Sequence, residues 1–307
     1  MTEAGLLRAP VYKGLRDDLA PEDIPITKPR RRTRTPAVPQ ENILQLLPDA
    51  DPPTQEQLAN YWTRVNARAL AHLANRPLKL VRHVRGTTFY HKGALPPVPD
   101  SVHKLKVAKR SGGEGTRLWV EDLDGLLGLT EIGVVELHPW NCTVEDIEIA
   151  DTMVIDLDPG PGIAWAFVVD AALTLRELLH QHGYESWPKL TGGKGIHVMI
   201  PLEEKLSHDE SHRCSRRIAA QLANIDPERF TISASLASRR ERLFIDYLRN
   251  GRGTTAIGTF SPRARPGHPI AAPATWDQIV SGISADHFTL EEIPPMQTRR
   301  AKRRASK

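Results

Sequence analysis

Residues 154–160 read VIDLDPG, an apolar strand that ends in two aspartates and a turn. Side chains alternate along a strand, so Asp156 and Asp158 share one face and Leu157 lies on the other. Two neighbouring carboxylates repel each other unless a cation lies between them. Carboxylate oxygens at the end of a buried strand suit Mg²⁺ or Mn²⁺. The stretch therefore predicts a metal site at a sheet; a solvated pair of acids at a strand end is the alternative.

A third aspartate lies in a second apolar stretch, residues 243–248, which read LFIDYL. Burying Asp246 there is costly unless the carboxylate is paired or bound to a metal. Read together with Asp156 and Asp158, it completes the acid set of a two-metal site for nucleotidyl transfer. Taken alone, Asp246 is equally well explained by an ion pair with an arginine.

The stretch 189–198, KLTGGKGIHV, joins two predicted strands through a glycine-rich turn. Small residues let backbone N–H groups approach an anion, and Thr191 and Lys194 add side-chain donors. The turn is not a P-loop, because a strand follows it where a helix would be required. Alternation along that strand turns His197 away from the core, toward a cleft. An ordinary tight hairpin explains the glycines equally well.

Basic and aromatic residues supply the remaining candidates for binding. Arg263 and Arg265 flank one alanine, so in extended chain both project to one side and can clamp a phosphate. A solvated basic loop is the alternative. Phe89 and Tyr90 lie among basic residues and can stack on bases, although core packing is the expected use of one of them. A lone histidine such as His138 is more often structural than catalytic.

Composition bounds the class of protein. The chain has 307 residues, a net charge of +4 and a pI near 9.1, which permits a polyanionic partner without proving one. It has no apolar run of the roughly 18 residues that span a bilayer and no signal pattern at its start. Cys142 and Cys214 are its only cysteines, which argues against a disulfide framework and for a reducing cytoplasm.

Strands and helices interleave along the chain, which predicts an α+β (α/β mixed) fold. Residues 1–38 form a predicted linker, 39–294 one catalytic body, and 295–307 a basic tail. A capping box at Thr54 and Gln57 starts the first helix, which Pro77 ends. The other predicted elements are strands over 78–84, 134–137, 152–158, 196–201 and 242–248, and helices over 122–132, over 164–182 and from Ser207.

Several of these motifs, in this order, resemble the polymerase domain of bacterial ligase D, within the archaeo-eukaryotic primase superfamily. The matching stretches are 156–162 (DLDPGPG), 191–197 (TGGKGIH), Asp246 with 250–253 (NGRG), 138–140 (HPW) and 261–266 (SPRARP). The resemblance covers roughly residues 38–294. In addition, residues 8–18 look like the end of an adenylating ligase domain, so the chain is either a piece of a larger ligase D or a split version.

The resemblance implies a primase-like core and a polymerase that fills gaps and extends ends at DNA double-strand breaks. It also implies two Mn²⁺ (or Mg²⁺) ions, a preference for ribonucleotides, and partnership with Ku and with ligase and phosphoesterase modules. The implied location is the bacterial cytoplasm, at the nucleoid. By motif, the metal ligands are Asp156, Asp158 and Asp246; the nucleotide contacts are His138, Thr191, Lys194, His197, Arg249, Arg263 and Arg265; and the DNA contacts are Phe89, Tyr90 and Arg64. The family usually has serine at the position of Thr191, and the hydroxyl is kept.

Relatives also carry two basic residues near the start of the domain that grip the 5′-phosphate across the gap. An ungapped comparison puts Gln45 and Gln55 at those positions, which predicts weaker dependence on that phosphate. The local match is poor, and Arg64 or the basic run 30–34 could replace the lost charge.

Three other classes share parts of this pattern. Phosphatases of the haloacid dehalogenase type have Asp-x-Asp after an apolar strand, but a Thr or Val usually follows there, where this chain has Pro159-Gly160. A sugar-nucleotide glycosyltransferase shares the metal motif without accounting for the basic clamp. A non-catalytic DNA-end-binding module has no need of three acids in apolar strands.

Overall fold

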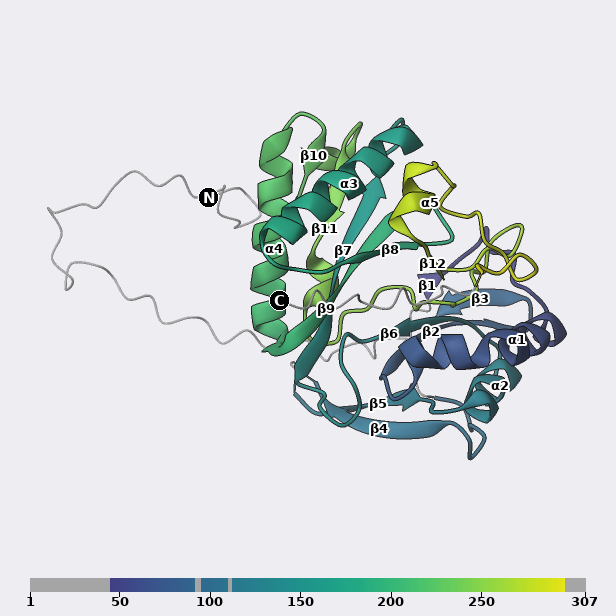
Figure 1. Cartoon of the computed structure of the whole chain (residues 1–307). Helices are drawn as coiled ribbons and strands as arrows, with labels where there is room; N and C mark the ends of the chain where they lie inside the picture. The colour runs from purple at the N-terminus through teal and green to yellow at the C-terminus, as the bar shows by residue number, and fades with distance from the viewer. Residues whose placement is uncertain (1–44, 92–94, 110–111, 296–307) are drawn as a thin grey trace, which may run out of the picture. The chain divides into compact units, whose positions relative to one another are not determined.

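The computed structural model describes residues 45–91, 95–109 and 112–295. The predicted linker over 1–38, the ligase-like stretch 8–18 and all but the first residue of the predicted tail over 295–307 lie outside them. Within the described residues, the strands form two six-stranded sheets (Figure 1). Together with the helices, these sheets confirm the α+β class.

The first sheet runs in the order β1-β3-β2-β5-β4, and β6 also pairs with β2. All of its pairings are antiparallel. Its strands are β1 (Gln45–Leu46), β2 (Leu78–Val84), β3 (Thr87–Tyr90), β4 (His103–Ala108), β5 (Glu114–Trp119) and β6 (Val134–Pro139).

The second sheet runs in the order β10-β11-β7-β9-β8-β12 and holds the motif strand near its centre. The strand β7 pairs antiparallel with β11 on one side and with β9 on the other. The strands of this second sheet are β7 (Ile149–Pro159), β8 (Trp187–Leu190), β9 (Ile196–Ser207), β10 (Phe230–Thr231), β11 (Leu243–Asp246) and β12 (Ala272–Pro273).

Helices cover both sheets. In Figure 1, α3 and α4 lie beside each other on the second sheet, and α1 packs on α2 beside the first. The helices are α1 (Gln55–Leu73), α2 (Leu123–Glu131), α3 (Trp165–Gln181), α4 (His208–Ile225) and α5 (Trp276–Val280), with 3-10 turns η2 (Leu236–Arg239) and η3 (Leu248–Asn250). Among the described residues, no helix has the length and apolar character that crossing a membrane requires.

Local signals in the sequence set the helix ends as predicted. Thr54 and Gln57 form both hydrogen bonds of a capping box at the start of α1. Ser207 caps α4 in the same way. Gly183 follows α3 with a φ of 79°, a left-handed conformation that glycine adopts without a Cβ penalty.

Several elements differ from the predictions; for example, β9 runs to Ser207 where the predicted strand ends at 201. The strand predicted over 242–248 ends at Asp246, because the Asp246 Oδ1 accepts a 2.8 Å hydrogen bond from the N–H of Leu248 and the chain turns into η3. The β4–β5 hairpin was not predicted. In β4, exposed Lys104 and Lys106 alternate with Leu105 and Val107, but β5 has its two apolar residues, Leu118 and Trp119, next to each other and lacks the apolar alternation that marks a strand.

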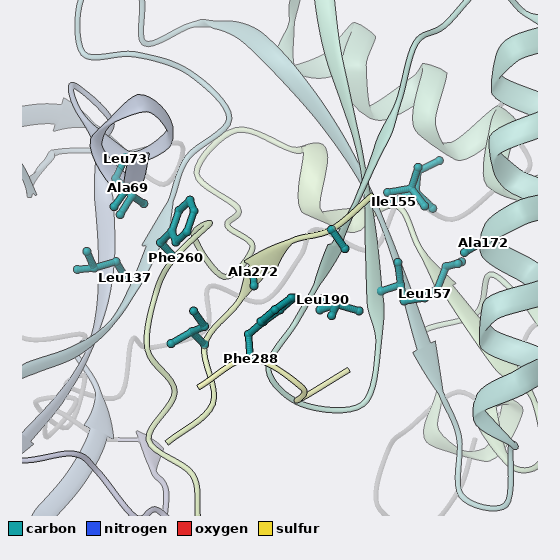
Figure 2. Close-up of a cluster of buried hydrophobic side chains, with 14 of the residues drawn as sticks. Ala69, Leu73, Leu137, Ile155, Leu157, Ala172, Leu190, Phe260, Ala272 and Phe288 are labelled. Atoms are coloured by element: carbon teal, nitrogen blue, oxygen red, sulfur yellow. The ribbon is translucent and has the colours of Figure 1, made fainter. Parts of the chain in front are cut away.

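One hydrophobic core joins the two sheets. It contains Leu137 from β6 and Leu157 from β7, with Phe260 between the layers (Figure 2). The Tyr61 hydroxyl of α1 donates a 2.7 Å hydrogen bond to the carbonyl of Phe260. The Ser261 hydroxyl accepts a 2.8 Å bond from the N–H of Leu137. The segment around 260 therefore fixes the first sheet against the second.

Candidate active site

The three aspartates come from two paired strands of the second sheet. Asp156 and Asp158 lie on one face of β7, and Leu157 is fully buried in the core on the other, as the alternation predicted. The antiparallel register of β11 places Asp246 directly opposite Asp156. The pairing of these strands thereby places two buried carboxylates side by side, although the two residues lie 90 positions apart in the sequence.

Positively charged side chains surround these acids. Arg249 bridges two of them: its Nη2 lies 3.4 Å from Asp156 Oδ2, and its Nε lies 3.0 Å from Asp246 Oδ2. Arg239 Nη1 lies 3.3 Å from Asp158 Oδ2. In the described part of the chain, no three His, Cys, Asp or Glu side chains are grouped so as to hold a metal ion directly. The guanidinium groups thus provide the cationic charge that the carboxylates need here.

The pKa values of the acids reflect burial and these charges. Burial raises the pKa of Asp156, but His197, Arg249 and Lys189 outweigh it and lower the pKa to about 2. Burial and the neighbouring Asp156 raise the pKa of Asp158. Hard oxygen donors of this kind, already gathered around a guanidinium, fit a divalent cation chemically.

The glycine-rich turn connects β8 to β9, as predicted, and its backbone lies against the motif strand. A Cβ at Gly195 would collide with the Leu157 carbonyl oxygen, so only glycine allows this approach. The Thr191 hydroxyl donates to the Gly195 carbonyl at 3.0 Å and accepts the Gly195 N–H at 3.2 Å. The predicted phosphate donor Thr191 therefore closes the turn itself, while Lys194 lines the cavity described below.

His197 lies opposite Asp156 in the register of β9, on the face that the alternation predicted. Its Nε2 is 3.4 Å from Asp156 Oδ2. Burial lowers the pKa of His197 to about 4, so its ring is neutral at pH 7. Among the described residues, the buried Nδ1 of this ring has no hydrogen-bond partner, and the residue lines the cavity described below.

His138 belongs to a buried network on the first sheet. Its Nε2 lies 2.9 Å from Glu136 Oε2, and Glu136 Oε1 accepts hydrogen bonds from Arg263 Nε and the Ala264 N–H at 3.1 and 3.0 Å. Burial lowers the pKa of His138, so the neutral ring donates Nε2–H to the carboxylate. The Tyr90 ring lies 5.3 Å from the His138 ring. The network fixes both rings beside the acids.

A cavity of about 290 Å³ joins most of the predicted residues. Asp246 lies behind it, in contact with Arg249. The lining residues are Tyr90, His138, Asp156, Asp158, Thr191, Gly193, Lys194, Gly195, His197, Arg249, Thr255, Ala256, Ile257, Arg263 and Arg265.

The structure separates the two predicted aromatics, and two predicted arginines have other contacts than expected. One of Phe89 and Tyr90 was expected to be buried; it is Phe89, and Tyr90 lines the cavity. Arg64 donates a 2.5 Å hydrogen bond to the Leu290 carbonyl, far along the chain, and does not line the cavity. Arg263 donates to the Thr191 carbonyl at 2.7 Å as well as to Glu136, so it braces the site.

Sequence reasoning missed four polar residues of this region: Glu136, Lys189 and Asn250, which are buried, and Arg239, which is half-buried. The signal for two of them was available, because Glu136 and Lys189 are charged residues inside short apolar strands. Lys189 donates a 2.6 Å hydrogen bond to the Ile257 carbonyl, and burial lowers its pKa to about 7. Asn250 had the appearance of a simple turn residue.

Comparison with known proteins gives concordant results. A sequence model described as "LigD, primase-polymerase domain" matches residues 54–304. The chain is 29% identical to the multifunctional non-homologous end joining protein LigD of Pseudomonas aeruginosa, over 96% of this chain and 37% of that protein. It is 31% identical to the bifunctional LigD of Bacillus subtilis, over 78% of this chain and 39% of that protein.

A solved structure, the polymerase domain of Mycobacterium tuberculosis ligase D in complex with DNA, also resembles the chain. The TM-score is 0.72 at 26% identity, over 78% of this chain and 86% of that one. This likeness confirms the primase-like fold expected from the sequence. The chain spans less than two fifths of the two curated relatives' length.

Proposed function

This chain belongs to the LigD primase–polymerase domain family, and from that membership we propose that it adds nucleotides to DNA ends and gaps during non-homologous end joining. The observation that carries the proposal is the placement of Asp156 and Asp158 in one cavity with Lys194 and Arg265. The acids offer a cation site, and the basic side chains suit a triphosphate.

The residues of the site have separable roles in this proposal. Asp156, Asp158 and Asp246 would hold two divalent ions, with Mn²⁺ favoured over Mg²⁺. When bound, such ions polarise the α-phosphate and stabilise the leaving pyrophosphate. Lys194 and Arg265 would bind the triphosphate oxygens through charge-assisted hydrogen bonds.

The remaining cavity walls would orient the nucleotide and the template. The neutral His197 ring lines the cavity and would contact a phosphate or its water shell. His138, held by Glu136, would lie at the sugar, and Tyr90 would stack on a base. We extend the proposal to a preference for ribonucleotides, to activity at the bacterial nucleoid, and to partnership with Ku and with ligase and phosphoesterase modules.

The direct test is extension of a labelled primer across a short gap, with Mn²⁺ and each nucleoside triphosphate. Template-dependent addition supports the proposal. Metal-dependent release of phosphate without any addition would instead indicate a phosphatase of the haloacid dehalogenase type, and binding of DNA ends without addition would indicate a non-catalytic module.

Arg265→Ala is expected to weaken nucleotide binding with little effect on DNA binding. A charged hydrogen bond is worth about 1.5–3 kcal/mol, so the KM for nucleotide should rise about tenfold or more. Nucleotide titration in the extension assay measures the effect, and Arg240→Ala, which removes an exposed arginine outside the cavity, is the matched control. An unchanged KM would place Arg265 on a solvated loop.

We also expect only weak dependence on a 5′-phosphate across the gap. The Gln55 amide donates to the carbonyls of Thr130 and Glu131 at 3.3 Å, so it binds the end of α2. Replacing two cations by neutral glutamines removes about 2–3 kcal/mol of phosphate recognition, which is tens of fold in affinity.

Paired gaps with a 5′-phosphate or a 5′-hydroxyl test this expectation, in binding and in extension. Gln55→Lys offers a gain-of-function comparison, because it restores one charge at that position. A strong preference of the unmodified chain for the phosphorylated gap would contradict the expectation and indicate a substitute basic residue.

A further inference from the structure

Arg249 has a position in the site that none of the other arginines shares. Its guanidinium lies between Asp156 and Asp246, 3.4 Å from an Oδ2 of one and 3.0 Å from an Oδ2 of the other. Because these aspartates are directly paired across β7 and β11, their carboxylates repel each other unless a cation neutralises them. Arg249 supplies that cation from within the chain.

The same oxygens are the ones that a divalent cation would use. A carboxylate oxygen in an ion pair with a guanidinium group at this distance is covered by that cation, whereas a metal ligand must offer the oxygen to the ion. The positive charges of the guanidinium group and of a metal ion would also repel each other at so short a distance. A guanidinium and a metal ion therefore compete for Asp156 and Asp246.

Of the three arginines that pair with carboxylates at the site, Arg249 has the most exposed side chain. Its side chain is 41% exposed, compared with 23% for Arg239 and 14% for Arg263. Arg239 is held over the ring of Phe244, 3.6 Å from its centroid, and Arg263 donates to a backbone carbonyl as well as to a carboxylate. The contacts described for Arg249 are ion pairs to the two aspartates.

We propose that Arg249 is an exchangeable counter-ion: it neutralises Asp156 and Asp246 in the metal-free protein, and a divalent cation displaces it into the cavity. There it joins Lys194 and Arg265 as a binding group for the triphosphate. The inference rests on the proposed function, because it takes these aspartates as the metal ligands. Cation binding then prepares the nucleotide site, and linkage makes the coupling reciprocal.

The exchange is tested by titrating the full chain with Mn²⁺ alone, without DNA or nucleotide, and measuring free Mn²⁺ by electron paramagnetic resonance. Arg249→Gln removes the competing cation and should tighten Mn²⁺ binding about tenfold, the change in Kd that corresponds to about 1.4 kcal/mol. Arg249→Lys should give an intermediate affinity. Arg252→Gln is the matched control, because Arg252 pairs with Glu148 at 2.6 Å outside the cavity. Equal or weaker Mn²⁺ binding in Arg249→Gln would overturn the proposal.

Thermal unfolding gives a second readout. Without Mn²⁺, Arg249→Gln should melt below the unmodified chain, because two buried carboxylates lose their counter-charge. Saturating Mn²⁺ should raise the Tm of Arg249→Gln more than that of the unmodified chain. A non-hydrolysable nucleotide, titrated at saturating Mn²⁺, should bind Arg249→Gln about tenfold more weakly than Arg252→Gln. Equal nucleotide binding by the two variants would overturn the proposal that the displaced Arg249 binds the triphosphate.

Asp156→Asn separates this inference from the proposed function. The proposed metal site predicts that the unmodified chain binds Mn²⁺ and that Asp156→Asn loses this binding. If either result fails, the metal site of the proposed function is wrong. If that binding is present but Arg249→Gln fails to tighten it, the exchange alone is wrong and the polymerase proposal stands.

Discussion

Asp158→Asn is expected to lower nucleotide addition at least about a thousandfold while the chain remains folded. The substitution keeps the shape of the side chain and removes the charge that a divalent cation requires. A loss of about 4 kcal/mol of transition-state stabilisation, which is within the several kcal/mol that a catalytic metal supplies, corresponds to that factor. Single-turnover extension of a primed gap with Mn²⁺ measures it.

The stability of this variant should change in the opposite direction. Burial and Asp156 raise the pKa of Asp158 above its unfolded value, so the ionised carboxylate disfavours the folded state. That cost is present at neutral pH and disappears as the pH falls below the unfolded pKa, about 3.9. Asp158→Asn should therefore unfold at a slightly higher urea concentration at pH 7, and this advantage should vanish in acid.

Glu148→Gln is the control for both measurements. It removes an exposed carboxylate that pairs with Arg252 outside the cavity, and it should leave addition unchanged. Extension by Asp158→Asn at a rate near that of the unmodified chain would refute the assignment of Asp158 as a metal ligand.

Asn250→Ala is expected to cost about 4 kcal/mol of unfolding free energy. The side chain is fully buried, its Oδ1 accepts the Val154 N–H at 2.7 Å, and its Nδ2 donates to the carbonyls of Val154 and Tyr247 at 2.7 and 2.8 Å. Each buried group left unpaired costs about 1–3 kcal/mol. Since β11 ends at Asp246, the Asn250 amide replaces the next strand residue as a partner of β7.

The loss is measured by urea unfolding. Asn66→Ala is the matched control, because the Asn66 amide makes one exposed hydrogen bond, to the Thr63 carbonyl. The folded fraction of Asn250→Ala should also extend primers slowly. Asn250 holds β7 at Val154, which lies two residues before Asp156, so its loss should disturb the position of that aspartate. A loss below about 1 kcal/mol would show that water replaces the amide and that β7 does not depend on it.

Elements with a strong local signal could be predicted from the sequence. The capping box at Thr54 and the alternation around Leu157 depend on neighbours within a few residues, and the structure agrees with both. The order of the motifs likewise identified the family and, through it, the fold. The β4–β5 hairpin was not predicted because β5, unlike β4, shows no apolar alternation along its sequence.

Contacts between distant residues could not be predicted from the sequence. Glu136 accepts a hydrogen bond from Arg263, which lies 127 positions away in the sequence, and Asn250 accepts one from Val154, 96 positions away. No local pattern specifies such pairs, since they exist only once the two sheets pack. For the same reason the sequence left open an ion pair of Asp246 with an arginine, which Arg249 makes, but it did not indicate that the same arginine also pairs with Asp156.

The shared core between the two sheets has a consequence for how catalysis could be prepared. Leu137, Phe260 and Leu157 belong to one packed cluster, so the His138 wall and the aspartate wall of the site cannot separate as hinged lobes without opening that cluster. Preorganisation is therefore built in during folding, and each turnover is spared the entropic cost of assembling the two walls.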